Sequence, residues 1–232
     1  MRDHSEVSQA AEDPQTPIRE EPANPVLTAE RLKAFVDAVV AIAMTLLILP
    51  LMEGVIALGH DGKGVPEYLA EDWGQLLSFA LSFLLIANFW MTHHRMFDRV
   101  ERTTNALVWI QVAWMFTIVW LPVPTAMLGS MPTDVLQKIL YIGSLLVTAL
   151  LMLGTRLYLR AHPELHSIPG ALLHRGIAVE IVLSALFASA LLVALLVPDI
   201  GYWAMFLMML SGPAQAIIAR RERHSAKASR AA

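Results

Sequence analysis

The chain has 232 residues, of which 56% are hydrophobic and only 16% are charged, whereas about 25% of the residues in an ordinary soluble domain carry charge. The charged residues gather at the two ends and in short strips between long apolar runs, which is the pattern of a membrane protein. The absence of cysteine excludes disulfides, thiolate metal sites and cysteine nucleophiles.

The two ends of the chain are polar. Residues 1–27 are acidic and dotted with proline, and they contain no apolar stretch behind which a signal peptide would be cleaved. We expect a disordered cytoplasmic tail there. Residues 221–232 are expected to form a second, basic cytoplasmic tail, and residues 28–220 between them a single transmembrane domain.

Six apolar runs follow one another in this domain, each close to the roughly 20 residues that cross about 30 Å of hydrocarbon. Backbone groups in lipid must be hydrogen-bonded within their own segment, so each run is predicted to be a helix. The runs are 32–52, 73–92, 106–128, 135–157, 177–197 and 202–219. Pro50, Pro122 and Pro124 are expected to kink or end helices. Residues 53–72, which are rich in glycine and acidic side chains, are expected to form a solvated loop or an acidic vestibule.

The Lys and Arg residues indicate how these helices are oriented, because cytoplasmic segments attract them. Nearly all of them lie in the two tails, in the connection after the second run and in the connection after the fourth. Both ends are therefore predicted to face the cytoplasm, in a multi-pass protein of the cell membrane. This alternation requires an even number of helices and so supports six.

The first run and the end of the second carry the most specific pattern. Two groups of residues match the ordered motifs of one family: Arg31, Phe35, Asp37, Ile42 and Thr45 in the first run, and Trp90, His93, His94 and Phe97 in the second. The chain thus resembles the transmembrane protein 175 family, which are potassium channels of animal lysosomes and many bacteria. It departs from the family at Val36, where the motif usually has Ser, so one hydroxyl is missing.

The resemblance implies an all-α integral membrane protein, in which six-helix subunits assemble as a homotetramer and the first helix lines a central pore. In this family an Ile or Leu ring forms a constriction in the middle of the membrane, and a threonine ring lies one turn further out. These positions fall on Ile42 and Thr45, so potassium is expected to pass near them. The family lacks the usual potassium filter, and this chain likewise has no Thr-Val-Gly-Tyr-Gly loop.

The spacing along the first helix agrees with such a pore face, because Ala38, Ile42, Thr45, Leu49 and Met52 form one helical stripe. One helix cannot enclose water, so a pore needs several subunits around an axis. Apolar rings would gate by dewetting, and threonine hydroxyls would favour potassium, which holds its water less tightly than sodium. The same spacing is also typical of a packing seam between helices, and that alternative stays open.

Asp37 is a carboxylate inside a membrane helix, which calls for a functional or structural explanation. It lies five residues from Ile42, about 140° round the helix, and therefore off the predicted pore face. We predict that it joins the first two helices in a polar network made of Arg31, Phe35, Asp37, Trp90, His93, His94 and Arg95. Removing the partners of such a buried charge is expected to destabilise the protein strongly.

Other ionisable residues inside the runs are also assigned structural roles. His93 and His94 are adjacent and point about 100° apart on a helix, so they are not expected to hold one metal ion. A proton-linked effect through either of them stays open. Glu180 is expected to pair with the nearby Arg175 or His174, or to extend its carboxylate toward the interface.

Three classes of function are considered, namely a potassium channel, a secondary transporter and a membrane enzyme. The residues favour the potassium channel, and the alternative is a secondary transporter that moves a cation or proton through Asp37 and the pair His93 and His94. The two three-helix halves show no convincing repeat, which a transporter usually has. Because the motifs of enzymes are absent, we expect no enzymatic activity, no cofactor and no nucleic-acid partner. The expected partners are further copies of the chain, membrane lipids and permeant potassium ions.

Overall fold

The computed structural model describes residues 28–132 and 134–196, and every regular element in these ranges is a helix. Five helical stretches of this part are long and apolar enough to cross a membrane: Ala29–His60, Trp73–Phe97, Asn105–Ser130, Val135–Ala161 and Gly170–Leu196. The prediction of an all-helical, multi-pass membrane protein is thereby confirmed. The sixth predicted helix, 202–219, and the predicted tails 1–27 and 221–232 lie outside the described residues.

Two of the five stretches are broken at a proline. The first consists of α1 (Ala29–Leu46) and α2 (Leu49–His60), and the third consists of α5 (Asn105–Trp120) and α6 (Pro122–Ser130). Pro50 and Pro122 stand in the first turns of α2 and α6. Proline has no N–H to donate to the carbonyl four residues earlier, which interrupts the helical hydrogen bonds at each point. The predicted breaks at these two prolines are confirmed.

The connection between the first two stretches is not the loop that its composition predicts. α2 continues to His60, and α3 (Val65–Glu71) follows after a short turn. The carboxylate of Glu67 accepts a hydrogen bond of 3.0 Å from the N–H of Gly64, which caps the start of α3. Lys63 donates to Glu71 at 2.7 Å, and this hydrogen bond raises the pKa of Lys63. Local capping and pairing therefore outweigh the glycine content.

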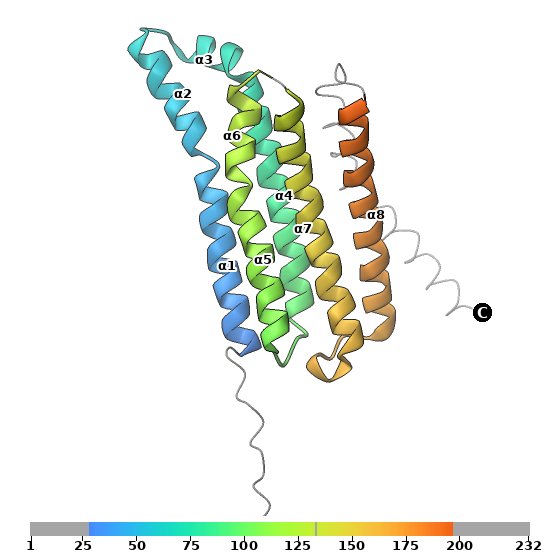
Figure 1. The fold of residues 1–232 in the computed structure, drawn as a ribbon. Coiled ribbons are helices and arrows are strands. Elements are labelled where there is room, and N and C mark those ends of the chain that lie inside the picture. Colours follow the sequence, from blue (N-terminus) through green and yellow to red (C-terminus); the bar gives the residue numbers. More distant parts are fainter. Residues whose placement is uncertain (1–27, 133, 197–232) are drawn as a thin grey trace, which may run out of the picture.

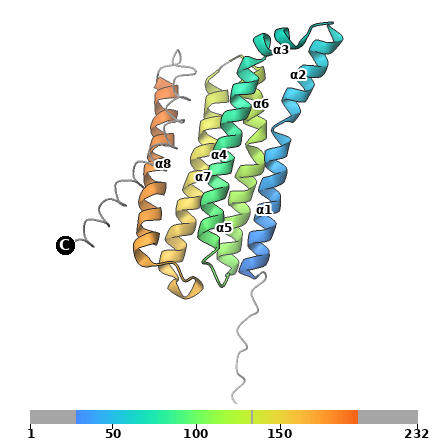
Figure 2. The same cartoon turned by 180° about the vertical axis from the view of Figure 1, so that it is seen from behind.

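The helices form one bundle in which α1 and α8 lie on opposite flanks (Figures 1 and 2). α4 (Trp73–Phe97) packs against α1 and α6, and α7 (Val135–Ala161) packs against α5 and α8 (Gly170–Leu196). The start of α1, the α4–α5 connection and the α7–α8 connection all lie at one end of the bundle (Figure 1). We call this the basic end, because it carries Arg31, Lys33, Arg95, Arg99, Arg102, Arg156, Arg160 and Arg175.

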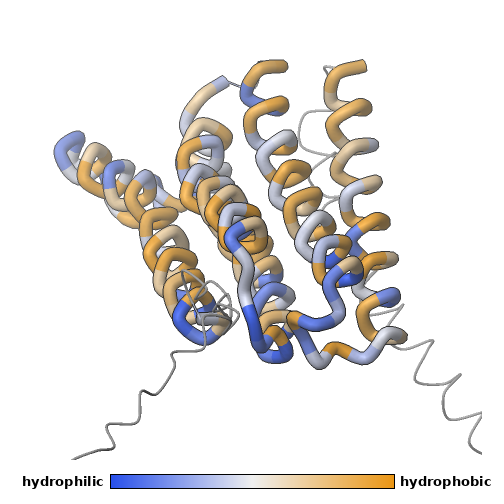
Figure 3. Tube along the Cα trace, turned by 60° about the horizontal axis from the view of Figure 1, so that its bottom comes forward, coloured by the Kyte–Doolittle hydropathy of each residue, from blue (hydrophilic) through white to orange (hydrophobic). Residues whose placement is uncertain are grey.

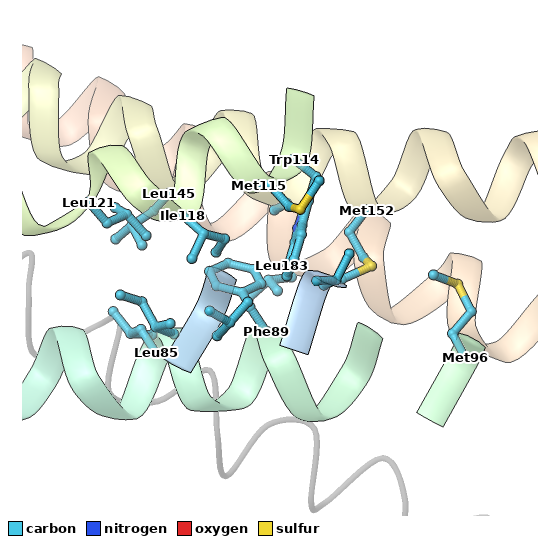
Figure 4. Close-up of a cluster of buried hydrophobic side chains, with 14 of the residues drawn as sticks. Leu85, Phe89, Met96, Trp114, Met115, Ile118, Leu121, Leu145, Met152 and Leu183 are labelled. Carbon is cyan, nitrogen blue, oxygen red and sulfur yellow. The ribbon is translucent and has the colours of Figure 1, made fainter. Parts of the chain in front are cut away.

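The core lies where α4, α5, α7 and α8 meet. Figure 4 shows its buried side chains, which include Leu85 and Phe89 of α4, Trp114 and Ile118 of α5, Leu145 and Met152 of α7, and Leu183 of α8. The rings of Phe89 and Phe187 lie 6.3 Å apart and connect α4 with α8. In lipid these contacts stabilise the bundle by close packing, because no apolar surface is removed from water there.

The helices are mostly apolar along their length, and hydrophilic residues concentrate toward their ends (Figure 3). Large exposed hydrophobic side chains occur on every side of it, for example Leu84 on α4, Phe116 on α5, Leu150 on α7 and Ile181 on α8. Such a belt of exposed apolar residues suits contact with lipid chains or with other membrane helices.

Candidate functional site

α1 has two different faces. One is buried in the bundle and carries Leu32, Val36, Val40 and Ala43. The opposite face carries the predicted stripe, and all of its members are exposed: Ala38, Ile42, Thr45, Leu49 and Met52. Ile42, at the middle of the stripe, is 60% exposed. The stripe therefore points away from its own subunit, toward whatever surrounds the bundle on the α1 flank.

Thr45 lies on this stripe just before the break between α1 and α2. Its hydroxyl donates to the backbone oxygen of Ile42 at 2.7 Å. Because the proton is committed to that carbonyl, the lone pairs of Oγ1 remain able to accept a hydrogen bond or to contact a cation. The N–H of Ile48 donates to the backbone oxygen of Thr45 at 3.3 Å, which tightens the backbone at the break. The stripe thus changes from apolar at Ile42 to oxygen-bearing one turn later.

Comparison with known proteins finds a family that is similar to the first part of the chain. Residues 31–122 match the family model described as the endosomal/lysosomal potassium channel TMEM175. Over these residues the chain is similar to the TMEM175 family. The matched range contains the whole stripe and both sequence motifs of α1 and α4.

The chain also resembles several curated proteins. It is 36% identical over 99 residues to a potassium channel of Streptomyces collinus, which covers 43% of this chain and 47% of that protein. It is 27% identical over 138 residues to a protein of Danio rerio that is named an endosomal/lysosomal proton channel, which covers 60% of this chain and 26% of that protein. The match thus spans about half of the bacterial relative and about a quarter of the animal one.

Two crystal structures share the fold. One is a lysosomal potassium-selective channel TMEM175 homolog from Chamaesiphon minutus, with a TM-score of 0.59, 24% identity, and coverage of 79% of this chain and 97% of that chain. The other is the potassium channel MtTMEM175, with a TM-score of 0.55, 17% identity, and coverage of 84% of this chain and 93% of that chain. At these identities the likeness establishes the fold, which is the helical bundle of the solved TMEM175 structures.

Part of the predicted polar network does meet between α1 and α4. Oδ1 of Asp37 accepts a hydrogen bond of 2.8 Å from the indole N–H of Trp90, and it lies 3.3 Å from Nδ1 of His94. The rings of Trp90 and His94 are 5.3 Å apart. These three side chains fasten α1 to α4 on the side of α1 that faces away from the stripe.

His93 faces another part of the bundle. Its Nε2 lies 2.9 Å from Oε1 of Gln111, whose Nε2 donates to Oγ1 of Thr155 at 2.9 Å. Its ring stacks on Phe97 and Trp114 at 4.3 and 4.7 Å. His93 therefore links α4 to α5 and α7, whereas the adjacent histidine links α4 to α1. Within residues 28–132 and 134–196, no group of three or more His, Cys, Asp or Glu side chains could hold a metal ion.

Three further members of the predicted network lie at the surface of the bundle. Arg31, Phe35 and Arg95 are exposed, and Arg95 lines a pocket on the other side of α4. A different ion pair adds to the attachment of α1, between Lys33 and Asp98 just after α4. The hydrogen bond from Lys33 lowers the pKa of Asp98, so this carboxylate stays charged at a lower pH than a free aspartate does.

Sequence reasoning missed a series of buried hydroxyl contacts between the helices. Thr125 of α6 donates to Ser82 of α4 at 2.8 Å, and Ser82 lies 2.9 Å from the hydroxyl of Tyr141 on α7. Thr148 of α7 donates to Thr117 of α5 at 2.9 Å. Such interhelical bonds contribute about 0.6 kcal/mol each in membrane proteins. In the sequence they appear only as single hydroxyl residues in apolar runs, which does not indicate the partners.

Glu180 pairs with a residue on another helix, and not with Arg175 or His174 as the sequence predicts. Its Oε1 accepts a hydrogen bond of 3.4 Å from Nε of Arg156 on α7, and Glu180 itself is only 2% exposed. Gly176 explains the close approach, because a Cβ at this position would overlap the guanidinium of Arg156. The partner of Glu180 therefore comes from α7, whereas the sequence predicts a partner on α8 itself.

Proposed function

We propose that the protein is a subunit of a potassium-selective channel whose wall is the exposed stripe of α1. The observation that carries this proposal is the exposure of apolar Ile42 beside the free oxygen lone pairs of Thr45, on a helix whose other face is buried. The TMEM175 match of residues 31–122 and the potassium-channel names of the bacterial relatives support it.

The stripe is one wall, and a closed pore needs a ring of copies around a common axis. We propose a homotetramer, which is the assembly that the family resemblance implies. In such a ring the four α1 helices face one another. The exposed apolar stripe of each subunit then lines the pore and does not contact lipid. The bundle of α4 to α8 then surrounds the ring and contacts the membrane.

Selection would occur by partial dehydration. A ring of Ile42 side chains forms a narrow apolar constriction, in which ions keep only part of their water. The hydroxyl oxygens of Thr45 replace some of the lost contacts one turn later. Potassium loses water more easily than sodium, so the barrier is lower for potassium, and a difference of about 1.4 kcal/mol in barrier height corresponds to a tenfold difference in rate.

We also propose that the basic end faces the cytoplasm, in a cell membrane. All the Lys and Arg residues of α1, of the α4–α5 connection and of the α7–α8 connection lie at that end. The opposite end carries Glu53, Asp61, Glu67 and Glu71, with Lys63 paired to one of them. This distribution follows the rule that cytoplasmic segments are enriched in Lys and Arg.

The test is single-channel recording of the full chain in planar bilayers with potassium on one side and sodium on the other. We expect unitary currents carried by potassium, and we expect Ile42→Asn to raise the leak by about tenfold and to reduce selectivity, because a polar ring stays hydrated. Ile181→Asn is the matched control, since Ile181 is exposed on the opposite flank. Identical behaviour of the two variants, or turnover at transporter rates, would contradict the proposal.

Proton conduction is the second candidate, because the animal relatives are named proton channels. The ionisable pair of Asp37 and His94, with 3.3 Å between carboxylate and imidazole, is partly exposed near the basic end. Asp37 and His94 of the alternative transporter mechanism bond in one cluster, and His93 bonds in another. This separation favours a role in holding helices together over a shared ion-binding site. A reversal potential that follows a pH gradient without any potassium gradient, and that is lost in Asp37→Asn, would establish this candidate instead.

A further inference from the structure

A pocket of about 200 Å³ opens at the basic end, on the side of the bundle where α4, α7 and α8 meet. Four arginines from separate parts of the chain line it: Arg95 on α4, Arg99 just after α4, Arg156 on α7 and Arg175 on α8. The rest of the wall is mostly apolar and includes Met96, Ile168 and Leu172. The pocket thus combines a cluster of guanidinium groups with a hydrophobic side.

The charge of this pocket is one-sided. No acidic residue is among the described residues that line it. One of the four guanidinium groups, that of Arg156, is bonded to the buried carboxylate of Glu180. The side chains of Arg95 and Arg99 are exposed. Guanidinium groups gathered in this way favour an anion with several oxygen atoms, because each can donate two parallel hydrogen bonds to it.

The frame of the pocket is held in place by backbone bonds between two connections. The N–H of Ser167 donates to the oxygen of Arg99 at 2.9 Å, and the N–H groups of Glu101 and Arg102 both donate to the oxygen of Leu165, at 2.9 and 3.1 Å. These bonds fasten the α4–α5 connection to the α7–α8 connection, which includes the short 3₁₀ turn Pro163–Leu165. The pocket is therefore formed before any ligand arrives, which reduces the entropic cost of binding.

We propose that this pocket binds the phosphate headgroup of an anionic phospholipid from the leaflet at the basic end. The arginines lie near the ends of helices that are long and apolar enough to span a membrane, where the headgroups of a bilayer would be expected. Leu172 is exposed beside them and offers an apolar surface to the start of an acyl chain. Basic pockets between membrane helices are a known way of holding such headgroups. The proposal does not depend on conduction, because α1 contributes no residue to the pocket.

The test is native mass spectrometry of the full chain in detergent, titrated with phosphatidylglycerol and, separately, with phosphatidylcholine. We expect phosphatidylglycerol to be retained preferentially. Arg95→Gln and Arg99→Gln should each weaken its binding by about fivefold, since one arginine near a membrane surface contributes on that scale. Arg99→Lys should lose less affinity for phosphatidylglycerol than Arg99→Gln, because lysine keeps the positive charge. It should still bind more weakly than the unchanged chain, because it lacks the paired donors of the guanidinium group.

Arg160→Gln is the matched control, because Arg160 is exposed at the same end of α7 and does not line the pocket. The variants avoid Arg156, whose loss would leave Glu180 without its partner. Three outcomes would overturn the proposal. These are equal loss in the control, equal binding of the two lipids, or displacement of phosphatidylglycerol by millimolar inorganic phosphate, which would make this a site for a soluble anion.

Discussion

The two flanks of the bundle look alike from outside. On α1, Ile42 is 60% exposed, and on α8, Ile181 is 52% exposed. Each flank also carries one hydroxyl that donates to its own backbone, from Thr45 to Ile42 at 2.7 Å and from Ser189 to Leu186 at 2.9 Å. Exposure and hydroxyl geometry are therefore alike on the two flanks, and it is their combination with the TMEM175 match, which contains α1 but not α8, that favours α1 as the proposed pore wall.

The flanks differ in how their helices run and how they are attached. α1 and α2 are separated by a break at Pro50, whereas α8 continues for 27 residues without one. α1 is held to α4 by Asp37, which is partly exposed, and α8 is held to α7 by the buried Glu180. An exposed apolar face thus shows only that a helix contacts lipid or a neighbouring subunit. The break and the mode of attachment are the features that distinguish α1 from α8.

The largest expected effect is on the attachment of α8. Arg156→Met leaves the buried carboxylate of Glu180 unpaired, and breaking such a pair costs about 3–5 kcal/mol of stability. Thermal unfolding in detergent measures it, with Arg160→Met as the exposed control on the same helix. The double variant Arg156→Met with Glu180→Leu should recover most of the loss. Equal unfolding temperatures of the two single variants would show that the ion pair does not hold this flank.

A smaller effect is expected on the attachment of α1. Trp90→Phe keeps an aromatic ring but removes the N–H that donates to Asp37 at 2.8 Å. Loss of a hydrogen bond to a charged group costs about 1.5 kcal/mol where, as here, the acceptor is partly solvated. Trp109→Phe is the control, because Trp109 is among the most exposed side chains of the bundle. If both variants unfold at the same temperature, the bond from Trp90 to Asp37 does not help to hold α1 to the bundle.

The smallest effect separates the two outer hydroxyls. Thr45→Val removes the oxygen from the α1 stripe at nearly constant shape, and Ser189→Ala removes the one on α8. In the proposed pore only the first should lower the preference for potassium over sodium, by about fivefold, since one hydrogen-bonding contact contributes about 1 kcal/mol. Reversal potentials with potassium and sodium on opposite sides measure this ratio. An equal change in both variants would remove the functional difference between the flanks.

Most of the membrane spans could be predicted from the sequence, because the thickness of the bilayer dictates the length of an apolar run. The second and fourth runs, 73–92 and 135–157, correspond to Trp73–Phe97 and Val135–Ala161. The helices continue past the predicted ends, into last turns that carry His94, Arg95 and Arg160, because a helix does not have to end where its apolar run ends. The segment 53–72 was harder to predict, because glycine indicates a loop only when neighbouring residues provide no helix cap.

The contacts of the candidate site could also be predicted only in part. Asp37 and Trp90 stand at the same depth on helices that follow one another, so their approach could be expected from the order of the runs. The contacts of His93 with Gln111 and of Glu180 with Arg156 depend on how each helix is rotated about its axis. Rotation is set by packing of the whole core, to which single hydroxyls, a glycine and large side chains all contribute, and a linear pattern does not contain it.

The break at Pro50 has a mechanical consequence. The stretch Ala29–His60 has 32 residues, which at 1.5 Å per residue is about 48 Å, half as long again as the hydrocarbon layer. The stretch is thus longer than a straight crossing of the hydrocarbon requires, and the break near Pro50 lets α2 follow a different direction from α1 (Figure 1). Its far end, near His60, can therefore extend beyond the hydrocarbon while α1 stays packed in the bundle around Ile42.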